Sequence, residues 1–223
     1  MAYWGYLPIV KNHINTFFKD HPNVLEIGLD LGQSFVPMLF YLSKNNPNFS
    51  LIGCDVLIKD PLKAILGGCS RDLTETQQLI IVTQSSLEFL PELEKQCNEL
   101  DKPISVAMID GDHNYHTVKK EFESIPKLLA PGGMVIFDDY DGRWSNQDEF
   151  FIEREGYADN EMALSREEGE EEIKGVKPAV DEFLAANPDW VMTKHPQFQN
   201  DEPVILFRKN EIGWRHLNED TDQ

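Results

Sequence analysis

Acidic side chains end two apolar runs in the middle of the chain. Asp110 ends the run ISVAMID, and Asp138 and Asp139 end the run MVIFDD. If these runs form neighbouring parallel strands, about 4.8 Å apart, the three carboxylates emerge at the same edge of a sheet. Each aspartate alone is typical of a cap on the segment that follows it. Together they predict a cation site, and a set of oxygen ligands favours a hard ion such as Mg²⁺.

A turn with two glycines follows the first apolar run, VLEI. Gly28 and Gly32 permit a sharp turn and a close approach of the backbone to a ligand, and the helix expected next would offer unpaired N–H donors. Asp55 ends the next run, LIGCD, where its carboxylate can accept hydrogen bonds from a ribose diol. A tight turn and a strand-end cap are the ordinary alternatives. The glycine turn and the strand-end aspartate, occurring together, predict a nucleoside-containing cofactor.

The same turn argues against one class of cofactor. Asp30 stands where the nicotinamide-binding fingerprint G-x-G-x-x-G requires its second glycine. A carboxylate at that position would crowd and repel a pyrophosphate. A nicotinamide-dependent dehydrogenase is therefore disfavoured.

A parallel sheet is needed to bring these residues together. Short apolar runs alternate with helical patterns along the chain, which is typical of β-α-β units and of the α/β fold class. The expected strands are five buried parallel ones and a final antiparallel pair, at residues 24–28, 51–55, 79–83, 104–110 and 134–138, and then 190–195 and 203–208.

Helices are predicted between the strands because apolar residues recur there at spacings of three and four. The predicted ranges are 34–44, 86–96, 116–129 and 176–186. Ser34 and Ser86 are placed to cap two of these helices, and Pro131-Gly132-Gly133 is expected to end the third.

Residues 1–209 are interpreted as a single domain, followed by a flexible acidic tail at 210–223. The polar stretch at about 141–175 contains the acidic run SREEGEEE and is interpreted as an insertion or lid. Arg143 and Trp144 come directly after the aspartates, so they are expected to reach the site. Near the N-terminus, Tyr6 belongs to an aromatic group that could cover the cofactor, form a dimer contact or pack on its own domain.

The composition restricts the classes of partner. The 223 residues carry a formal net charge of −19, and 41% of them are hydrophobic, which is typical of a folded acidic protein. Such a charge repels phosphate backbones and anionic lipids, so we expect neither a nucleic-acid nor a membrane partner. The three cysteines form no C-x-x-C pair, and no secretion signal or membrane-length apolar run is evident. A cytoplasmic location is expected.

The motifs, taken in order, resemble a known family. E-I-G-x-x-x-G-x-S, a strand ending in Asp, I-D-G-D-H-x-Y and P-G-G-x-x-x-F-D-D-Y are similar to the class I S-adenosylmethionine-dependent methyltransferases, in particular the macrocin-type and novobiocin-type sugar O-methyltransferases. The resemblance covers about residues 20–208. It implies a Rossmann-like, mostly parallel seven-stranded sheet with a C-terminal antiparallel hairpin. It also implies metal-assisted methyl transfer to a hydroxyl of a small molecule, such as a sugar or a sugar-bearing natural product, and leaves a homodimer as an open expectation.

The resemblance also implies roles for individual residues. The cofactor would contact the turn through Glu26, Gly28, Gly32 and Ser34, its ribose through Asp55, and its adenine through Gln84 and Ser85. The family's usual Gly-Asp-Ser is here Thr83-Gln84-Ser85, so an acidic contact to the adenine is replaced. By similarity, Asp138, Asp139 and Asp110 would bind the metal, with Asp110 also next to the cofactor.

Two residues compete for the role of general base. Asp112 lies two residues after the first metal ligand and is favoured by the resemblance, whereas His113 is of the residue type that ordinarily gains and loses a proton near neutral pH. A histidine next to a carboxylate cluster can equally orient its neighbours.

Three rival functions remain open. Aminopropyltransferases share the fold and the acidic strand ends, and would need carboxylates free to bind a polyamine. Nucleic-acid or protein N-methylation is weakened, because I-D-G-D occupies the place of the Asp/Asn-Pro-Pro-Tyr tetrapeptide. A non-catalytic cofactor-binding module is disfavoured, since a purely structural domain has no need for converging carboxylates.

Overall fold

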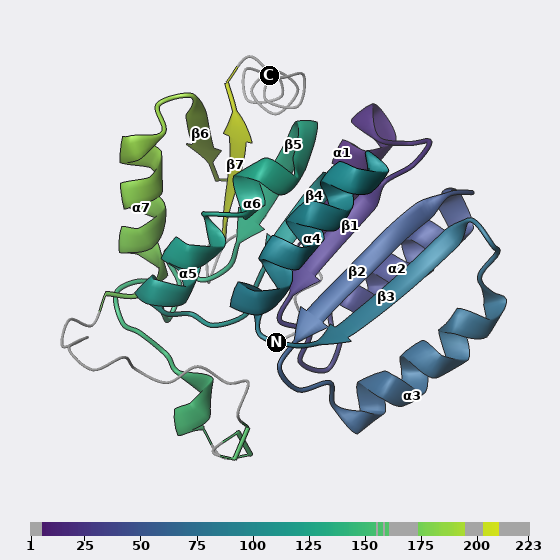
Figure 1. Cartoon of the computed structure of the whole chain (residues 1–223), viewed down its shortest axis with the longest axis horizontal. Helices are drawn as coiled ribbons and strands as arrows, with labels where there is room; N and C mark the ends of the chain where they lie inside the picture. The colour runs from purple at the N-terminus through teal and green to yellow at the C-terminus, as the bar shows by residue number, and fades with distance from the viewer. Residues whose placement is uncertain (1–5, 155, 158, 161–173, 195–202, 210–223) are drawn as a thin grey trace.

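Seven strands form one sheet in the order β3-β2-β1-β4-β5-β7-β6 (Figure 1). The computed structural model describes residues 6–154, 156–157, 159–160, 174–194 and 203–209. Neighbouring strands from β1 to β5 pair in parallel, whereas β7 runs antiparallel to both β5 and β6. The strands are β1 Asn23–Ile27, β2 Phe49–Asp55, β3 Gln77–Thr83, β4 Ile104–Ile109, β5 Leu129–Phe137, β6 Trp190–Thr193 and β7 Val204–Arg208. The predicted mostly parallel sheet with an antiparallel C-terminal pair is confirmed.

Helices cover both faces of this sheet. They are α1 Tyr6–Phe17, α2 Phe35–Asn45, α3 Asp60–Cys69, α4 Ser86–Leu100, α5 Tyr115–Glu121, α6 Ile125–Leu128 and α7 Val176–Ala186. Apolar side chains of α1, α2 and α3 form one core cluster with one face of the sheet, and those of α4 to α7 form a second cluster with the other face. Figure 1 shows α4 to α7 in front of the sheet and α1 and α2 behind it. Because β1 and β4 lie between the two layers, every residue in them is buried, and all but Asn23, Glu26 and Ser105 are apolar.

The predicted helix at 116–129 is wrong in its extent. The chain instead forms α5, leaves the helix at Phe122, and starts the short α6 at Ile125. Pro126 lies in the first turn of α6, where its missing N–H is tolerated, but it could not have continued α5. The Pro131-Gly132-Gly133 segment also differs from its predicted role as a helix end, because it lies inside β5.

The two predicted serine caps are corrected. Ser85, rather than Ser86, caps α4, because its hydroxyl oxygen accepts a hydrogen bond from the Leu87 N–H at 3.3 Å. Ser34 does occupy the N-cap position of α2, but its side chain makes no capping bond and donates to Glu26 instead. The N-terminal helix α1 has no counterpart among the predicted helices.

Part of the expected insertion and all of the expected tail lie outside the described residues. The acidic SREEGEEE run falls within residues 161–173, and the tail covers 210–223. Among the helices that the structure describes, none combines the length and the apolar composition needed to cross a membrane.

Candidate active site

The carboxyl ends of β1, β4 and β5 bring the predicted acidic residues together. Ile109 of β4 pairs with Phe137 of β5, so the next residues, Asp110 and Asp138, emerge side by side. The backbone continues this register, because Asp138 donates to the Ile109 carbonyl at 3.0 Å and Asp110 donates to the Ile27 carbonyl at 2.9 Å. The sequence-based expectation that these aspartates share one edge is confirmed in this geometry.

Gly28 makes the close approach of the β1 turn to β4 possible. Its φ is +83°, and a Cβ at this position would lie 1.8 Å from the carbonyl oxygen of Asp110. No other residue type fits there without displacing the backbone of β4. The glycine therefore keeps the two strand ends, and the groups that follow them, in contact.

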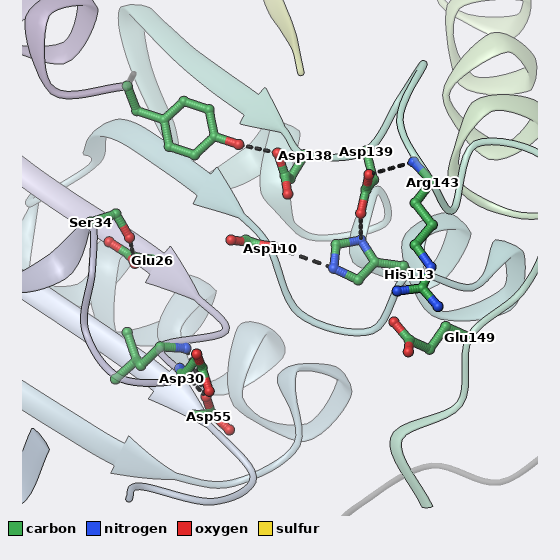
Figure 2. A network of polar contacts seen from close by, with 12 residues as sticks. Glu26, Asp30, Ser34, Asp55, Asp110, His113, Asp138, Asp139, Arg143 and Glu149 are labelled. Atoms are coloured by element: carbon green, nitrogen blue, oxygen red, sulfur yellow. Dashed lines mark hydrogen bonds and ion pairs between the residues drawn. The ribbon is translucent and has the colours of Figure 1, made fainter. Parts of the chain in front are cut away.

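A pocket of about 390 Å³ opens at this edge of the sheet. Its wall contains ten of the residues predicted for the site, namely Gly28, Ser34, Asp55, Gln84, Ser85, Asp110, Asp112, His113, Asp138 and Asp139. Glu26 and Gly32 do not border it. The Glu26 carboxylate contacts the hydroxyl of Ser34, so it reaches the pocket only through that residue (Figure 2). Their predicted role as direct cofactor contacts stays a prediction.

Asp55 organises the turn that it faces. Its Oδ2 accepts hydrogen bonds from the backbone N–H of Leu29 at 2.7 Å and of Asp30 at 3.1 Å, and its Oδ1 accepts one from Leu57 at 2.9 Å. A carboxylate has about four lone-pair sites, so capacity remains for a ribose hydroxyl. The strand-end cap and the cofactor role are thus compatible on one side chain.

Three side chains could hold a metal ion. Ligand atoms of Asp110, His113 and Asp138 all lie within 4.8 Å of one another. The group differs from the predicted one, because His113 is included and Asp139 is not. Mixed carboxylate and imidazole ligands still suit a divalent cation.

Asp139 lies at the border of this group. Its φ is +54°, and its Oδ1 accepts a hydrogen bond from the Arg143 N–H at 2.9 Å, which closes the turn after β5. Its Oδ2 lies 3.6 Å from Nδ1 of His113, while Nε2 of His113 lies 3.3 Å from Asp110. Figure 2 shows Asp110 and Asp139 on opposite sides of the imidazole. Asp110 and Asp139 thus lie near the two ring nitrogens of His113.

Burial raises the pKa of several acidic groups in the pocket. It raises the pKa of Asp110 to about 7 and that of Asp112 to about 6. The pKa of Asp138 is well above its usual value because of burial and the charge of Asp110. A divalent cation would relieve this cost, since it favours the ionised carboxylates. The residues present therefore fit a cation at this place.

The sequence marks only some of the further residues that complete the site. Tyr6 of α1 donates a hydrogen bond to Asp138, which confirms that it packs on its own domain. Trp144, Glu149, Arg154 and Tyr157 of the segment after β5 complete the pocket wall. Trp144 was expected there from its position next to the aspartates, but the other three could be found only once the path of the insertion was known.

A mostly parallel α/β sheet with a reversed last strand, a glycine turn after β1, an aspartate at the end of β2 and a pocket across these ends is typical of class I S-adenosylmethionine-dependent methyltransferases. Residues 25–140 match the family described as "Methyltransferase domain" (Methyltransf_24), and the chain belongs to this family. The sequence resemblance and the fold are thereby confirmed.

One curated relative is similar in sequence over part of its length. Uncharacterized protein R132 of Acanthamoeba polyphaga mimivirus is 30% identical over 146 residues, which are 62% of this chain and 61% of that protein. The chain thus matches somewhat less than two thirds of this relative's length.

Solved structures with the same fold include three methyltransferases. CalS11, a TDP-rhamnose 3′-O-methyltransferase of calicheamicin biosynthesis, has a TM-score of 0.59 at 15% identity, over 92% of this chain and 78% of that one. An O-methyltransferase from Bacillus cereus in complex with SAH has a TM-score of 0.56 at 20% identity, over 94% and 82%. MycE of the mycinamycin pathway, in complex with Mg, SAH and mycinamycin VI, has a TM-score of 0.54 at 16% identity, over 91% and 48%.

Proposed function

We propose that this protein transfers the methyl group of S-adenosylmethionine to a hydroxyl of a small molecule, with help from a bound Mg²⁺ ion. The observation that carries the proposal is the juxtaposition of two half-sites in one pocket. The Gly28 turn and Asp55 form the cofactor half-site. The metal half-site consists of ligand atoms of Asp110, His113 and Asp138, which lie within 4.8 Å of one another. The fold relatives include O-methyltransferases, and one of them was solved with Mg and SAH.

Each half-site has a distinct role in this proposal. Asp55 and the turn would hold the nucleoside, while Gln84 and Ser85 would lie at its base. Asp110 and Asp138, with His113 or Asp139, would hold the metal. A bound Mg²⁺ would lower the pKa of an acceptor hydroxyl and fix its oxygen for attack.

Asp112 is the proposed general base. Both ring nitrogens of His113 face carboxylates, Asp110 on one side and Asp139 on the other, so the imidazole is engaged in the site itself. Asp112 also lines the pocket. Transfer forms a bond between the acceptor oxygen and the methyl carbon while the carbon–sulfur bond breaks, and the hydroxyl proton passes to the Asp112 carboxylate.

Calorimetric titration of S-adenosylmethionine and S-adenosylhomocysteine into the full chain tests the proposal. Both should bind, and hydroxylated acceptors should then be methylated in the presence of Mg²⁺ but not of a chelator. Asp112→Asn should lose turnover and keep the affinity for S-adenosylhomocysteine. Absence of binding by either nucleoside in a folded sample would remove the cofactor from the proposal.

A calorimetric titration with spermidine separates aminopropyl transfer from methyl transfer. An aminopropyltransferase would leave its carboxylates free for a polyamine, so spermidine would bind tightly in the presence of a chelator. We expect instead that spermidine binds weakly and competes with Mg²⁺.

We also propose a reducing, cytoplasmic location. Cys54, Cys69 and Cys97 are all free thiols in the structure, which suits a compartment that keeps cysteines reduced. Microscopy of the tagged full chain in its source cell would test this.

A further inference from the structure

The segment after β5 forms an ordered wall of the pocket. The Trp144 carbonyl accepts a hydrogen bond from the Val176 N–H at 3.1 Å, and the Ser145 carbonyl accepts one from the Lys177 N–H at 3.0 Å. The Asp148 carboxylate accepts from the Tyr115 N–H at 2.7 Å. These bonds tie residues 144–148 to the N-terminal ends of both α5 and α7, so side chains on this wall have defined positions.

The backbone of Glu149 is hydrogen-bonded to the loop between β4 and α5, which contains His113. Its backbone N–H donates to the His113 carbonyl at 3.2 Å, and its side chain lines the pocket. In Figure 2, Glu149 and Asp110 lie on different sides of His113, and the guanidinium of Arg143 is drawn between the His113 imidazole and the Glu149 carboxylate. Glu149 therefore borders the acceptor side of the pocket, away from the nucleoside half-site.

The carboxylate of Glu149 is incompletely paired. Its side chain is only 6% exposed, and one oxygen contacts the guanidinium of Arg154. The other oxygen, Oε2, is buried and has no hydrogen-bond partner among the described residues. An unsatisfied buried acceptor costs about 1–3 kcal/mol, and more when it is charged, so a donor from a ligand would stabilise it.

The pairing of Glu149 with Arg154 selects one kind of ligand group. A carboxylate accepts hydrogen bonds, and a guanidinium donates them in a fixed fork. Because the Glu149–Arg154 pair is neutral as a whole, it gives neither an anionic group nor an ammonium group enough net attraction to offset the loss of its hydration. A neutral hydroxyl suits both because it donates to one and accepts from the other. The indole of Trp144, which Arg154 approaches to 5.8 Å, adds an apolar surface beside them.

We propose that Glu149, Arg154 and Trp144 form an acceptor subsite that binds a second, non-reacting hydroxyl of a neutral, polyhydroxylated acceptor. The inference rests on the proposed function, because the reacting hydroxyl would lie at the neighbouring aspartates. It makes the insertion the part of the chain that distinguishes a ring bearing several hydroxyls from a simple aromatic diol and from a phosphorylated sugar.

Saturation-transfer NMR on the full chain, loaded with Mg²⁺ and S-adenosylhomocysteine, tests the subsite. The probes are methyl glycosides of common hexoses and 6-deoxyhexoses, the matching sugar 1-phosphates, and catechol. We expect at least one methyl glycoside to bind, and its 1-phosphate to bind about 10-fold more weakly or not at all. Glu149→Gln should weaken the glycoside about 10-fold and leave catechol and S-adenosylhomocysteine unchanged.

Two further variants keep the result interpretable. Arg154→Lys keeps a positive charge beside the buried Glu149 carboxylate but removes the guanidinium fork, so this variant should fold and bind the same glycoside more weakly. Glu153→Gln changes an exposed carboxylate outside the pocket wall and should have no effect. Three results would overturn the subsite. They are equal glycoside affinity in wild type and Glu149→Gln, stronger binding of the 1-phosphates than of the glycosides, and no glycoside binding by wild type. Loss of S-adenosylhomocysteine binding in wild type would instead contradict the proposed function.

Discussion

The hydroxyl of Tyr6 donates a hydrogen bond to Oδ1 of Asp138, and this contact joins two residues 132 positions apart. Tyr6 begins α1 and is 3% exposed, while Asp138 follows β5 and is 4% exposed. The bond leaves the second oxygen of Asp138 to face the metal group. The N-terminal helix thus fixes the orientation of a carboxylate at the centre of the proposed metal site.

Tyr6→Phe should weaken Mg²⁺ or Mn²⁺ binding by about 10-fold, because removal of a group that orients a metal ligand typically has an effect of this size. The phenyl ring keeps the packing of α1, so we expect little change in the melting temperature. Titration of Mn²⁺ followed by electron paramagnetic resonance measures the affinity directly. Tyr41→Phe, whose exposed hydroxyl contacts Asn15, is the matched control and should bind metal like wild type. Unchanged affinity in Tyr6→Phe would show that the contact has no role in the metal site.

Gly28→Ala should destabilise the fold by about 3 kcal/mol or more, because a methyl group there would lie 1.8 Å from the Asp110 carbonyl in a backbone conformation that alanine rarely adopts. The contrasting variant is Gly67→Ala in α3, where no atom lies within 4 Å of the added methyl. This variant should be more stable than wild type by about 0.5–1 kcal/mol, since alanine favours a helix over glycine. Urea unfolding of both variants measures whether Gly28→Ala lowers the free energy of unfolding and Gly67→Ala raises it. Equal changes in the two variants would contradict the role of Gly28.

Asp55→Ala should reduce the affinity for S-adenosylhomocysteine by at least about 10-fold. The change removes the expected ribose acceptor, two backbone hydrogen bonds that hold the turn after β1 and one that holds the segment after β2. Calorimetric titration gives the affinity, and circular dichroism shows whether the fold is kept. Asp60→Ala, which changes a nearby exposed carboxylate, should bind the nucleoside like wild type. If the two variants bind equally well, the nucleoside does not lie against Asp55.

The sequence predicts the sheet well because its central strands are buried on both faces. Such strands are continuous apolar runs, and the aspartates that end them are easy to locate. The limits of the prediction also have physical reasons. A helical spacing of apolar residues extends through Phe122 and Leu129, so the break before Pro126 was missed. Tyr6 reaches Asp138, and Glu149 and Arg154 reach the pocket wall, through long-range packing that no local pattern encodes. Asp139 shows a third limit, since one aspartate can both close a turn and face a site.

Glu121 of α5 provides a prediction about pH. It is 1% exposed, and the neighbouring hydroxyl of Ser86 only partly offsets the cost of burying its carboxylate. Burial, with a contribution from the charge of Asp112, raises its pKa to about 8 from 4.5. Because the folded pKa is raised, the folded state binds the proton more tightly than the unfolded state. The protonated Glu121 carboxyl therefore makes its whole contribution to the free energy of unfolding below about pH 4.5, and this contribution is lost as the pH rises through about 8.

Glu121→Gln removes this titration and keeps the shape of the side chain. As the pH rises from about 5 to about 8, the wild type should therefore lose stability that the variant keeps, so the unfolding free energy of the variant should rise relative to that of the wild type. Its size should be on the order of 4 kcal/mol over this range, from 1.36 kcal/mol for each unit of pKa shift. Urea unfolding across the pH range measures it, and Glu123→Gln, an exposed neighbour, should show a flat difference. A flat difference for Glu121→Gln as well would mean that Glu121 titrates as it does in the unfolded chain.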